Sequence, residues 1–153
     1  MKYDLIAGKK VSDIEARPAR APVVQLLAEA RLPIDDIGDD LEHFFAARTG
    51  TCLDGVVGIE IYDGLALVRS LAVTPSKRGS GIGSELLACA ERFSSEKGVR
   101  SLFLLTTTAK RYFEQRGYVE LPRDAAPASI KATTEFSKLC PASAVLMTKV
   151  IRV

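Results

Sequence analysis

Residues 78–83 of this 153-residue chain read Arg-Gly-Ser-Gly-Ile-Gly. They follow an apolar stretch that ends at Val73, and they precede a helical pattern that begins near Gly83. The first turn of a helix offers unpaired backbone N–H groups and the positive end of the helix dipole, which suit phosphate oxygens. The glycines keep Cβ atoms away from those amides, and Lys77 adds positive charge beside Arg78. The pattern indicates a pyrophosphate site; the alternative is a plain turn in which glycine only permits unusual dihedral angles.

Two common phosphate-binding motifs do not match this loop. A P-loop ends in Gly-Lys-Ser/Thr, whereas Gly83 is followed by Ser84-Glu85. A dinucleotide-binding fold requires glycine where Ser84 stands and an acidic residue at the end of the next strand. That strand ends in three threonines at 106–108, without a carboxylate to hold a ribose. The loop is therefore expected to bind a different phosphate ligand.

The composition is that of a single globular domain. The chain is 47% apolar and 26% charged, and its 21 basic and 19 acidic residues give a net charge of only +2, too small a basic field to favour nucleic acid. No apolar run approaches the roughly 20 residues of a membrane helix. The three cysteines form no CxxC pair and no signal peptide is visible, so we expect a cytoplasmic protein. Because there is only one histidine, we expect no metal site.

Turn residues divide the first half of the chain into short elements. Residues 1–12 show no sustained period and are interpreted as a leader or edge segment of uncertain order, ahead of one domain over 13–153. The acidic run at 35–42 predicts a surface loop or short helix, with a lid over a site as the alternative. The predicted elements are a strand at 13–17, a helix between Pro22 and Pro33, and strands at 43–49, 56–62 and 65–73. Turn residues at Gly50, Asp54-Gly55 and Asp63-Gly64 predict an antiparallel meander.

The second half of the chain alternates helices and strands. The spacing of its apolar residues predicts a helix at 83–97. Since this helix connects the strand that ends at Val73 to the next strand, these two strands are expected to be parallel. The later predicted elements are a strand at 101–106, a helix at 109–116, a strand at 118–121, a helix at 129–139 and a strand at 144–151.

The loop pattern R-x-x-G-x-G, formed by Arg78, Gly81 and Gly83, resembles that of the GNAT superfamily of N-acetyltransferases. The likeness spans about residues 13–150. It includes a Leu-Ala-Val-x-Pro strand end at 71–75 and the family's second motif at Ala109, Phe113 and Gly117-Tyr118. The resemblance implies an α/β (α+β) acyl-CoA N-acyltransferase fold, in which helices flank a central mixed, mostly antiparallel sheet.

The same resemblance implies that acetyl-CoA is the cosubstrate. In the family, the arginine-and-glycine loop holds the pyrophosphate and the preceding strand hydrogen-bonds the pantetheine arm. The cofactor-binding residues that it implies here are Leu71, Ala72, Val73, Arg78, Gly79, Ser80, Gly81, Ile82, Gly83, Ser84, Thr106, Arg111 and Phe113.

The chain departs from the family pattern at two of these positions. Many relatives have asparagine where Thr106 stands and tyrosine where Phe113 stands. That tyrosine often acts as the general acid toward the departing thiolate, and phenylalanine cannot give up a proton. The adjacent Tyr112 lies about 100° around the helix axis and is interpreted as packing. The acid is therefore water, another group or none.

Shorter strings are similar to the acetyltransferases encoded in bacterial arsenic-resistance operons. They lie at 68–73, 105–108, 134–136 and 139–144. Better understood relatives acetylate the α-amine of phosphinothricin or arsinothricin, which are glutamate-like molecules with an acidic head. This resemblance implies an amino-acid-like acid as the acceptor, and it leaves any role of the cysteines in arsenic binding open.

Two charged residues are candidates for the acceptor end of the site. Acetyl transfer requires a neutral amine, and Glu60 is the candidate base, directly or through water; the alternative is an outward-facing strand carboxylate. Arg69 shares the alternation of Leu67, Leu71 and Val73, so in a regular strand it lies among apolar neighbours and needs a partner. Three roles are open for Arg69. It binds an acidic group of the substrate, it forms a structural ion pair, for example with Glu60, or a bulge turns it to solvent.

Two main classes of function, and a third that is less favoured, are compatible with these residues. The first is an N-acetyltransferase that moves acetyl from acetyl-CoA to a small-molecule amine. The second is a non-catalytic coenzyme A-binding sensor or accessory protein, which the missing tyrosine at Phe113 permits. A protein acetyltransferase is a third, less favoured class because no peptide-binding extension is evident. No nucleic-acid or membrane partner is expected, and a homodimer is left open.

Overall fold

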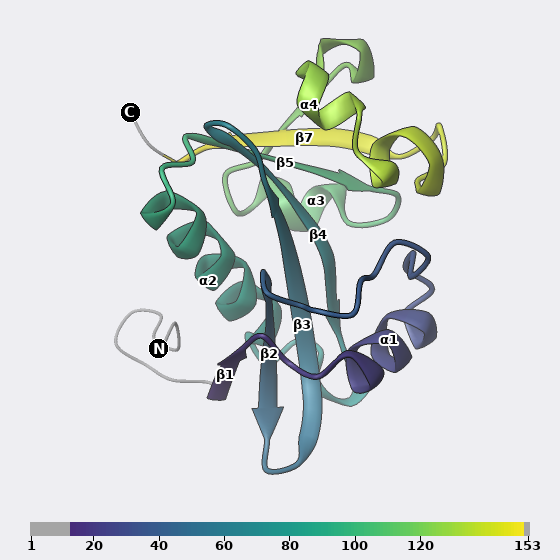
Figure 1. Cartoon of the computed structure of the whole chain (residues 1–153), viewed down its shortest axis with the longest axis vertical. Coiled ribbons are helices and arrows are strands. Elements are labelled where there is room, and N and C mark those ends of the chain that lie inside the picture. The colour runs from purple at the N-terminus through teal and green to yellow at the C-terminus, as the bar shows by residue number, and fades with distance from the viewer. Residues whose placement is uncertain (1–12, 152–153) are drawn as a thin grey trace.

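A seven-stranded sheet organises residues 13–151, the part of the chain that the computed structural model describes (Figure 1). Its strands are β1 (Asp13–Ala16), β2 (Phe44–Thr49), β3 (Cys52–Ile61), β4 (Leu65–Val73), β5 (Ser101–Thr106), β6 (Val119–Leu121) and β7 (Val145–Val150). The strand order is β1-β2-β3-β4-β5-β7-β6, and only β4 and β5 are parallel. The mixed, mostly antiparallel sheet and its parallel pair are thus confirmed. The leader predicted at 1–12 lies outside the described residues.

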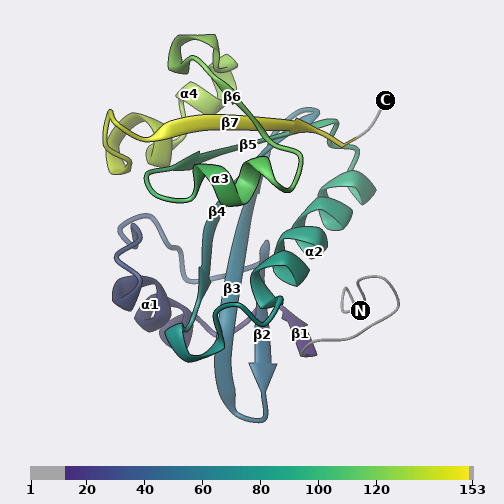
Figure 2. The ribbon, with the colours of Figure 1, turned by 180° about the vertical axis from the view of Figure 1, so that it is seen from behind.

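Helices cover both faces of this sheet (Figures 1 and 2). They are α1 (Arg20–Glu29), α2 (Ile82–Glu96), α3 (Lys110–Glu114) and α4 (Ala128–Lys131), with 3-10 turns η1 (Pro75–Lys77) and η2 (Arg123–Ala125) and a π-helix η3 (Glu135–Leu139). Strand alternation sends Val57 into the core beneath α2 and its neighbour Val56 into the core beneath α1. Likewise, Leu104 joins the α2 side and Phe103 the α4 side. No helix within residues 13–151 is long and apolar enough to cross a membrane.

The parallel strands β4 and β5 stay together over only three residue pairs. Leu65–Leu67 pairs with Ser101–Phe103, and beyond them the strands separate. In β4, Ser70 has a left-handed φ of 58°, and the register with β3 slips by one residue there. The bulge reverses the alternation: Leu67 packs on the α4 side, whereas Leu71 packs on the α2 side. The expectation for a regular strand, that Arg69 shares a face with Leu71, is therefore wrong: Arg69 lies beside Glu135, on the side of Leu67, and the bulge does not turn it to solvent.

The Asp54-Gly55 pair is not a turn, contrary to the sequence prediction. It lies inside β3, and the turn into this strand is at Gly50-Thr51. Asp54 is buried and accepts a hydrogen bond of 2.5 Å from the Thr49 hydroxyl. A Cβ atom on Gly55 would lie 2.9 Å from Leu86 Cδ1 of α2. The glycine allows α2 to approach the sheet closely. Local sequence cannot distinguish a glycine needed for such packing from a glycine needed for a turn.

The predicted helix at 129–139 is interrupted. It divides into α4 and η3 because the Thr133 hydroxyl donates to the carbonyl of Ile130 and accepts from the N–H of Phe136. These side-chain bonds compete with the helical backbone pattern. The acidic run at 35–42 forms turns without a helix, and its Ile37 packs beneath α1.

Candidate functional site

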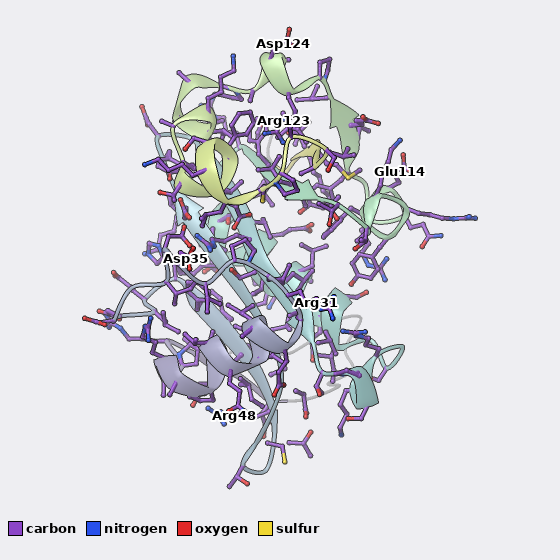
Figure 3. The ribbon with its side chains drawn as sticks, turned by 90° about the vertical axis from the view of Figure 1, so that its right-hand side faces the viewer. Arg31, Asp35, Arg48, Glu114, Arg123 and Asp124 are labelled. Atoms are coloured by element: carbon purple, nitrogen blue, oxygen red, sulfur yellow. The ribbon has the colours of Figure 1, made fainter. Side chains whose placement is uncertain are left out.

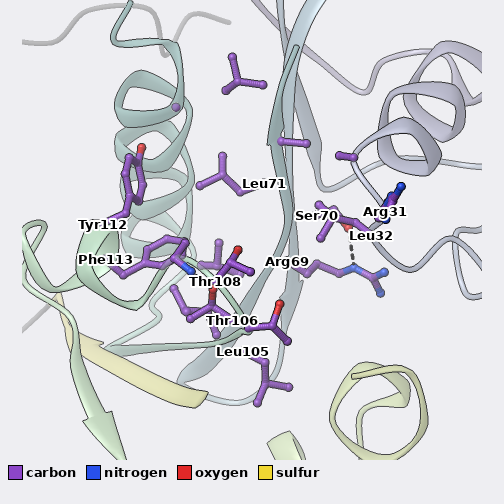
Figure 4. Close-up of a pocket in the computed structure, with 18 of the residues that line it drawn as sticks. Arg31, Leu32, Arg69, Ser70, Leu71, Leu105, Thr106, Thr108, Tyr112 and Phe113 are labelled. Atoms are coloured by element: carbon purple, nitrogen blue, oxygen red, sulfur yellow. Dashed lines mark hydrogen bonds between the residues drawn. The ribbon is translucent and has the colours of Figure 1, made fainter. Parts of the chain in front are cut away.

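A cavity of about 1290 Å³ opens where β4 and β5 separate. The walls come from residues 68–73 of β4, residues 104–108 at the end of β5, the first turn of α2 and the loop after α1. The C-terminal segment, residues 135–144 from η3 to the start of β7, completes them. Arg31, labelled in Figure 3, lines it from the loop after α1. Figure 4 shows Leu71, Tyr112 and Phe113 on one side of β4 and Arg69 and Arg31 on the other. The cavity therefore reaches both faces of the sheet.

One end of the cavity is bounded by the glycine loop and the first turn of α2. Gly79 and Gly81 adopt left-handed φ angles of 80° and 92°, and Gly81 is the N-cap of α2. In the described part of the chain, no N–H of residues 79–84 donates to a backbone carbonyl; the first to do so is that of Glu85, to Gly81. Arg78 is exposed and donates through Nε to the carbonyl of Val73 at 3.1 Å. The loop therefore presents unpaired amides and positive charge together.

Tyr112 packs beside this first turn. Its hydroxyl is buried and has no hydrogen-bond partner among residues 13–151. A Cβ atom on Gly83 would lie 2.7 Å from that hydroxyl oxygen, so only glycine leaves room for it. Arg116 covers the ring, with its guanidinium carbon 3.6 Å from the ring centroid, and donates to the Ser84 hydroxyl at 2.7 Å. A buried hydroxyl without a partner at a cavity wall is suited to bind a ligand atom.

The middle of the cavity follows the separated strand edges. Beyond Leu67 and Phe103, the facing edges of β4 and β5 have no strand pairing, so their backbone groups border the cavity. Thr106 accepts a hydrogen bond of 2.9 Å from the N–H of Ala109 and so fixes the start of α3. Phe113 is buried and packs edge to face on Tyr112, with ring centroids 5.2 Å apart.

At the other end, Arg69 is surrounded by three carboxylates. Its side chain is only 3% exposed, and it binds Asp36 through both Nη1 and Nη2, the latter at 2.7 Å. Nη1 also donates to Glu60 at 2.9 Å, and Nε donates to the Ser70 hydroxyl at 3.0 Å (Figure 4). A Glu135 oxygen lies 3.3 Å from Nε. Burial disfavours the charged form of Arg69, but the bonds to Asp36 and the other carboxylates outweigh it and raise its pKa.

Glu135 was missed as a site residue by the sequence analysis. It begins η3, lines the cavity and is 4% exposed as a residue. Burial raises its pKa to about 7, with Arg69 acting in the opposite direction. One signal was present in the sequence: Glu135 is the only acidic residue after Asp124.

Most of the site residues predicted from the sequence line the cavity, but Ser80, Arg111 and Glu60 do not. Of the predicted cofactor residues, all but Ser80 and Arg111 line it, and Arg116 lines it in addition. Ser80 is exposed and donates to the carbonyl of Lys77, and Arg111 is exposed on α3. Glu60 lies outside the lining, where it accepts hydrogen bonds from Arg69 and from the Tyr62 hydroxyl at 2.6 Å.

Comparison with known proteins places this arrangement among acetyltransferases. Residues 40–120 match the family model described as an acetyltransferase (GNAT) domain. The chain is 35% identical over 98 residues to an uncharacterized N-acetyltransferase of Chlorobaculum tepidum, an alignment that covers 63% of each chain. It is 39% identical over 59 residues to an amino-acid acetyltransferase of Ectopseudomonas mendocina, covering 39% of this chain and 14% of that protein. The chain thus spans less than two thirds of either relative.

Solved structures show the same fold. An N-acetylglutamate synthase from Neisseria gonorrhoeae, complexed with coenzyme A and N-acetyl-glutamate, superposes with a TM-score of 0.78. The match covers 92% of this chain and 35% of that chain, at 18% sequence identity. At this identity the likeness establishes the fold alone.

Proposed function

Because the chain belongs to the GNAT family of acetyltransferases, we propose that it transfers acetyl from acetyl-CoA to the amine of a small molecule. One observation carries the proposal: a single cavity joins unpaired backbone amides on the α2 face to Arg69 and the Glu135 carboxylate on the α1 face. The first end suits the pyrophosphate of a coenzyme, and the second suits an amine. The two substrates would therefore meet between β4 and β5.

The residues present fit acetyl-CoA. The amides of residues 79–84 and the charges of Lys77 and Arg78 would hold its pyrophosphate. The partnerless hydroxyl of Tyr112 would find an acceptor or donor on the same ligand. The unpaired edge of β4 would hydrogen-bond the pantetheine arm, and Phe113 would pack against it. The acetyl thioester supplies the activated acyl group.

The amine must be neutral to react, because an ammonium has no lone pair. For a lysine-like amine with a pKa of ~10.4, deprotonation at pH 7 costs about 4.6 kcal/mol at ~1.36 kcal/mol per pKa unit. A peptide-like α-amine with a pKa near ~7.7–8.0 costs only about 1 kcal/mol. A free amino acid lies between these extremes, so a site with few bases favours its α-amine over a lysine side chain, and this supports a small amino-acid-like acceptor. Phosphinothricin and arsinothricin are our proposed examples of that class, and the matches to amino-acid acetyltransferases agree with it.

An acidic acceptor also needs a cation. Arg69 lines the cavity, but Asp36 and Glu60 already occupy its terminal nitrogens, so an acid bound there would have to displace a carboxylate. Arg31 lines the same side, is exposed, and has no ion-pair partner in the described part of the chain. The contacts favour Arg31 for direct binding of the acid and Arg69 for holding the carboxylates in place.

A second candidate function is a coenzyme A-binding sensor without catalysis, which Phe113 at the usual tyrosine position favours. The two functions are separated by measuring thiol release from acetyl-CoA with a panel of amines: glutamate, phosphinothricin, arsinothricin and neutral amino acids. An acetyltransferase releases thiol with at least one of them. A sensor binds acetyl-CoA in calorimetry and releases thiol with none. Gly81→Asp, which places a carboxylate and a Cβ atom in the phosphate site, should abolish acetyl-CoA binding in a folded protein.

A further inference from the structure

We propose that Glu135 is the general base that takes the proton from the acceptor ammonium, and that Arg69 is a positioning residue for it. This inference rests on the proposed acetyl transfer and assigns a residue to one of its steps. Glu135 enters the cavity from the C-terminal segment, whereas the carboxylate suggested by sequence, Glu60, lies outside the lining. A base must reach the proton that it removes, so position separates the two carboxylates first.

The hydrogen bonds around Arg69 divide its three carboxylate partners unequally. Asp36 receives two bonds from the guanidinium, and Glu60 receives one from it and one from the Tyr62 hydroxyl. The Nε hydrogen goes to the Ser70 hydroxyl, so Glu135 is near the guanidinium without a hydrogen bond from it. Within residues 13–151, no donor hydrogen-bonds the Glu135 carboxylate. Its oxygens are therefore the ones left to accept a proton.

The charged and titratable groups that face Glu135 keep its pKa near neutral pH. They are Arg69 on β4, Asp36 on the loop after α1, Glu60 on β3 and the Cys140 thiol that follows η3. One arginine against three carboxylates leaves a surplus of negative charge, which favours a proton on one of them. Burial directs this proton to Glu135, the least exposed of the three side chains, and raises its pKa to about 7. Burial also raises the pKa of Cys140 to about 11, so this thiol stays protonated.

Atoms and charges balance across the transfer. The acceptor R–NH3+ gives one proton to the Glu135 carboxylate and becomes R–NH2. The amine nitrogen attacks the thioester carbonyl carbon, the C–N bond forms, and the C–S bond breaks with its electron pair leaving on sulfur. The nitrogen loses its second proton to become an amide, and one proton returns to the coenzyme A thiolate. The net products are the N-acetylated acceptor, coenzyme A as the free thiol, and one proton released to solvent.

The test compares two nucleophiles on the full chain. One is the α-amino acid of the panel that gives the fastest thiol release; the other is hydroxylamine, which is already neutral at pH 7 and needs no base. Glu135→Gln should lower kcat/KM for the α-amino acid by about 100-fold or more at pH 7, with hydroxylamine acetylated at the wild-type rate. The wild-type kcat/KM should rise with pH through about 7. In Glu135→Gln, this rise should move to the higher pKa of the amine itself.

Control variants make the outcome decisive. Glu91→Gln removes a half-buried carboxylate that pairs with Lys149 away from the cavity, and it should leave both nucleophiles unaffected. Equal losses for both nucleophiles in Glu135→Gln would overturn the proposal, because a base is needed by only one. So would a loss confined to the α-amino acid in Glu60→Gln with none in Glu135→Gln. Failure of the proposed function itself is seen separately, as a wild-type chain that releases no thiol with either nucleophile.

Discussion

At the scale of single residues, the glycines of the phosphate loop serve different purposes. Gly79 has a left-handed φ of 80° and open space where a Cβ atom would lie, whereas Gly83 has Tyr112 Oη 2.7 Å from its ideal Cβ position. Gly79→Ala should therefore lower the free energy of unfolding by about 1 kcal/mol through backbone strain. Gly83→Ala should instead displace the tyrosine and weaken acetyl-CoA binding. Thermal unfolding and calorimetry on the two variants measure this contrast; equal effects on binding would contradict it.

The hydroxyl of Tyr112 provides a second prediction at this scale. A buried hydroxyl without a partner destabilises the free protein, so Tyr112→Phe should raise the free energy of unfolding by about 1 kcal/mol in the absence of ligand. The same change should weaken acetyl-CoA binding by about 2- to 10-fold, the value of one hydrogen bond. The Arg116 stacking on the ring is kept. If kcat falls while the affinity for acetyl-CoA is unchanged, the hydroxyl belongs to the chemical step instead.

Glu135 makes stability depend on pH. Burial raises its pKa from 4.5 to about 7, so between these values the folded chain holds a proton that the unfolded chain has released. The free energy of unfolding of the wild type should therefore fall as pH rises through this window. Relative to wild type, Glu135→Gln should gain stability across it by on the order of 3 kcal/mol, at ~1.36 kcal/mol per pKa unit. Urea unfolding at about pH 4.5 and pH 8 tests this, and a difference that does not change with pH would contradict it.

At the scale of elements, local sequence predicted most strands and helices, but not the points where a strand continues through turn-like residues or contains a bulge. The parallel β4–β5 pair follows from the intervening helix alone, and it was predicted correctly. Asp54-Gly55 has the composition of a turn, and only the packing of α2 on Gly55 explains its place within β3. A bulge near Arg69 was one of the alternatives from the sequence, but nothing in the residue type places it at Ser70, whose backbone is left-handed.

The contact between α2 and β3 can be tested at Gly55. A methyl group there would lie 2.9 Å from Leu86 Cδ1 and 3.0 Å from the carbonyl oxygen of Ala72, so the helix or the strand must move. Gly55→Ala should lower the free energy of unfolding by about 1–3 kcal/mol, as overpacking does in well-packed cores. Gly38→Ala is the matched control, because nothing lies within 4 Å of its added methyl group. Similar values for the two variants would show that the approach of α2 tolerates a side chain.

At the scale of the whole molecule, one half of the site could be predicted from the sequence and the other only in part. The half on the α2 face is built around one continuous loop, whose motif was visible in the sequence, and Tyr112 and Arg116 complete it. The half on the α1 face brings together Asp36, Glu60, Arg69 and Glu135, which are far apart in the chain. In the sequence, each of these four residues resembles any other charged residue. Only the separation of β4 from β5 opens one cavity that reaches from the phosphate loop to Arg69 (Figure 4).

This arrangement leads to a comparison of the two arginines on the α1 face. Arg69 joins β4 to the loop after α1, to β3 and to η3, so Arg69→Lys should lower the free energy of unfolding by about 1.5–3 kcal/mol, the value of a charged hydrogen bond. Its kcat/KM should fall alike for acidic and neutral acceptors. Arg31 has no ion pair within the described residues, so Arg31→Gln should leave stability unchanged. It should lower kcat/KM for acidic acceptors alone, by roughly 10- to 150-fold.

The measurements are urea unfolding and thiol release with one acidic and one neutral amino acid. Lysine is chosen at Arg69 because it keeps a positive charge among three carboxylates, whereas a neutral residue there would leave them without a counter-charge and strongly destabilise the chain. A selective loss of acidic acceptors in Arg69→Lys, with stability intact, would mean that an acidic substrate displaces Asp36 and binds the guanidinium itself. In that case the hydrogen bonds between Asp36 and Arg69, which join the loop after α1 to β4, must break during each turnover.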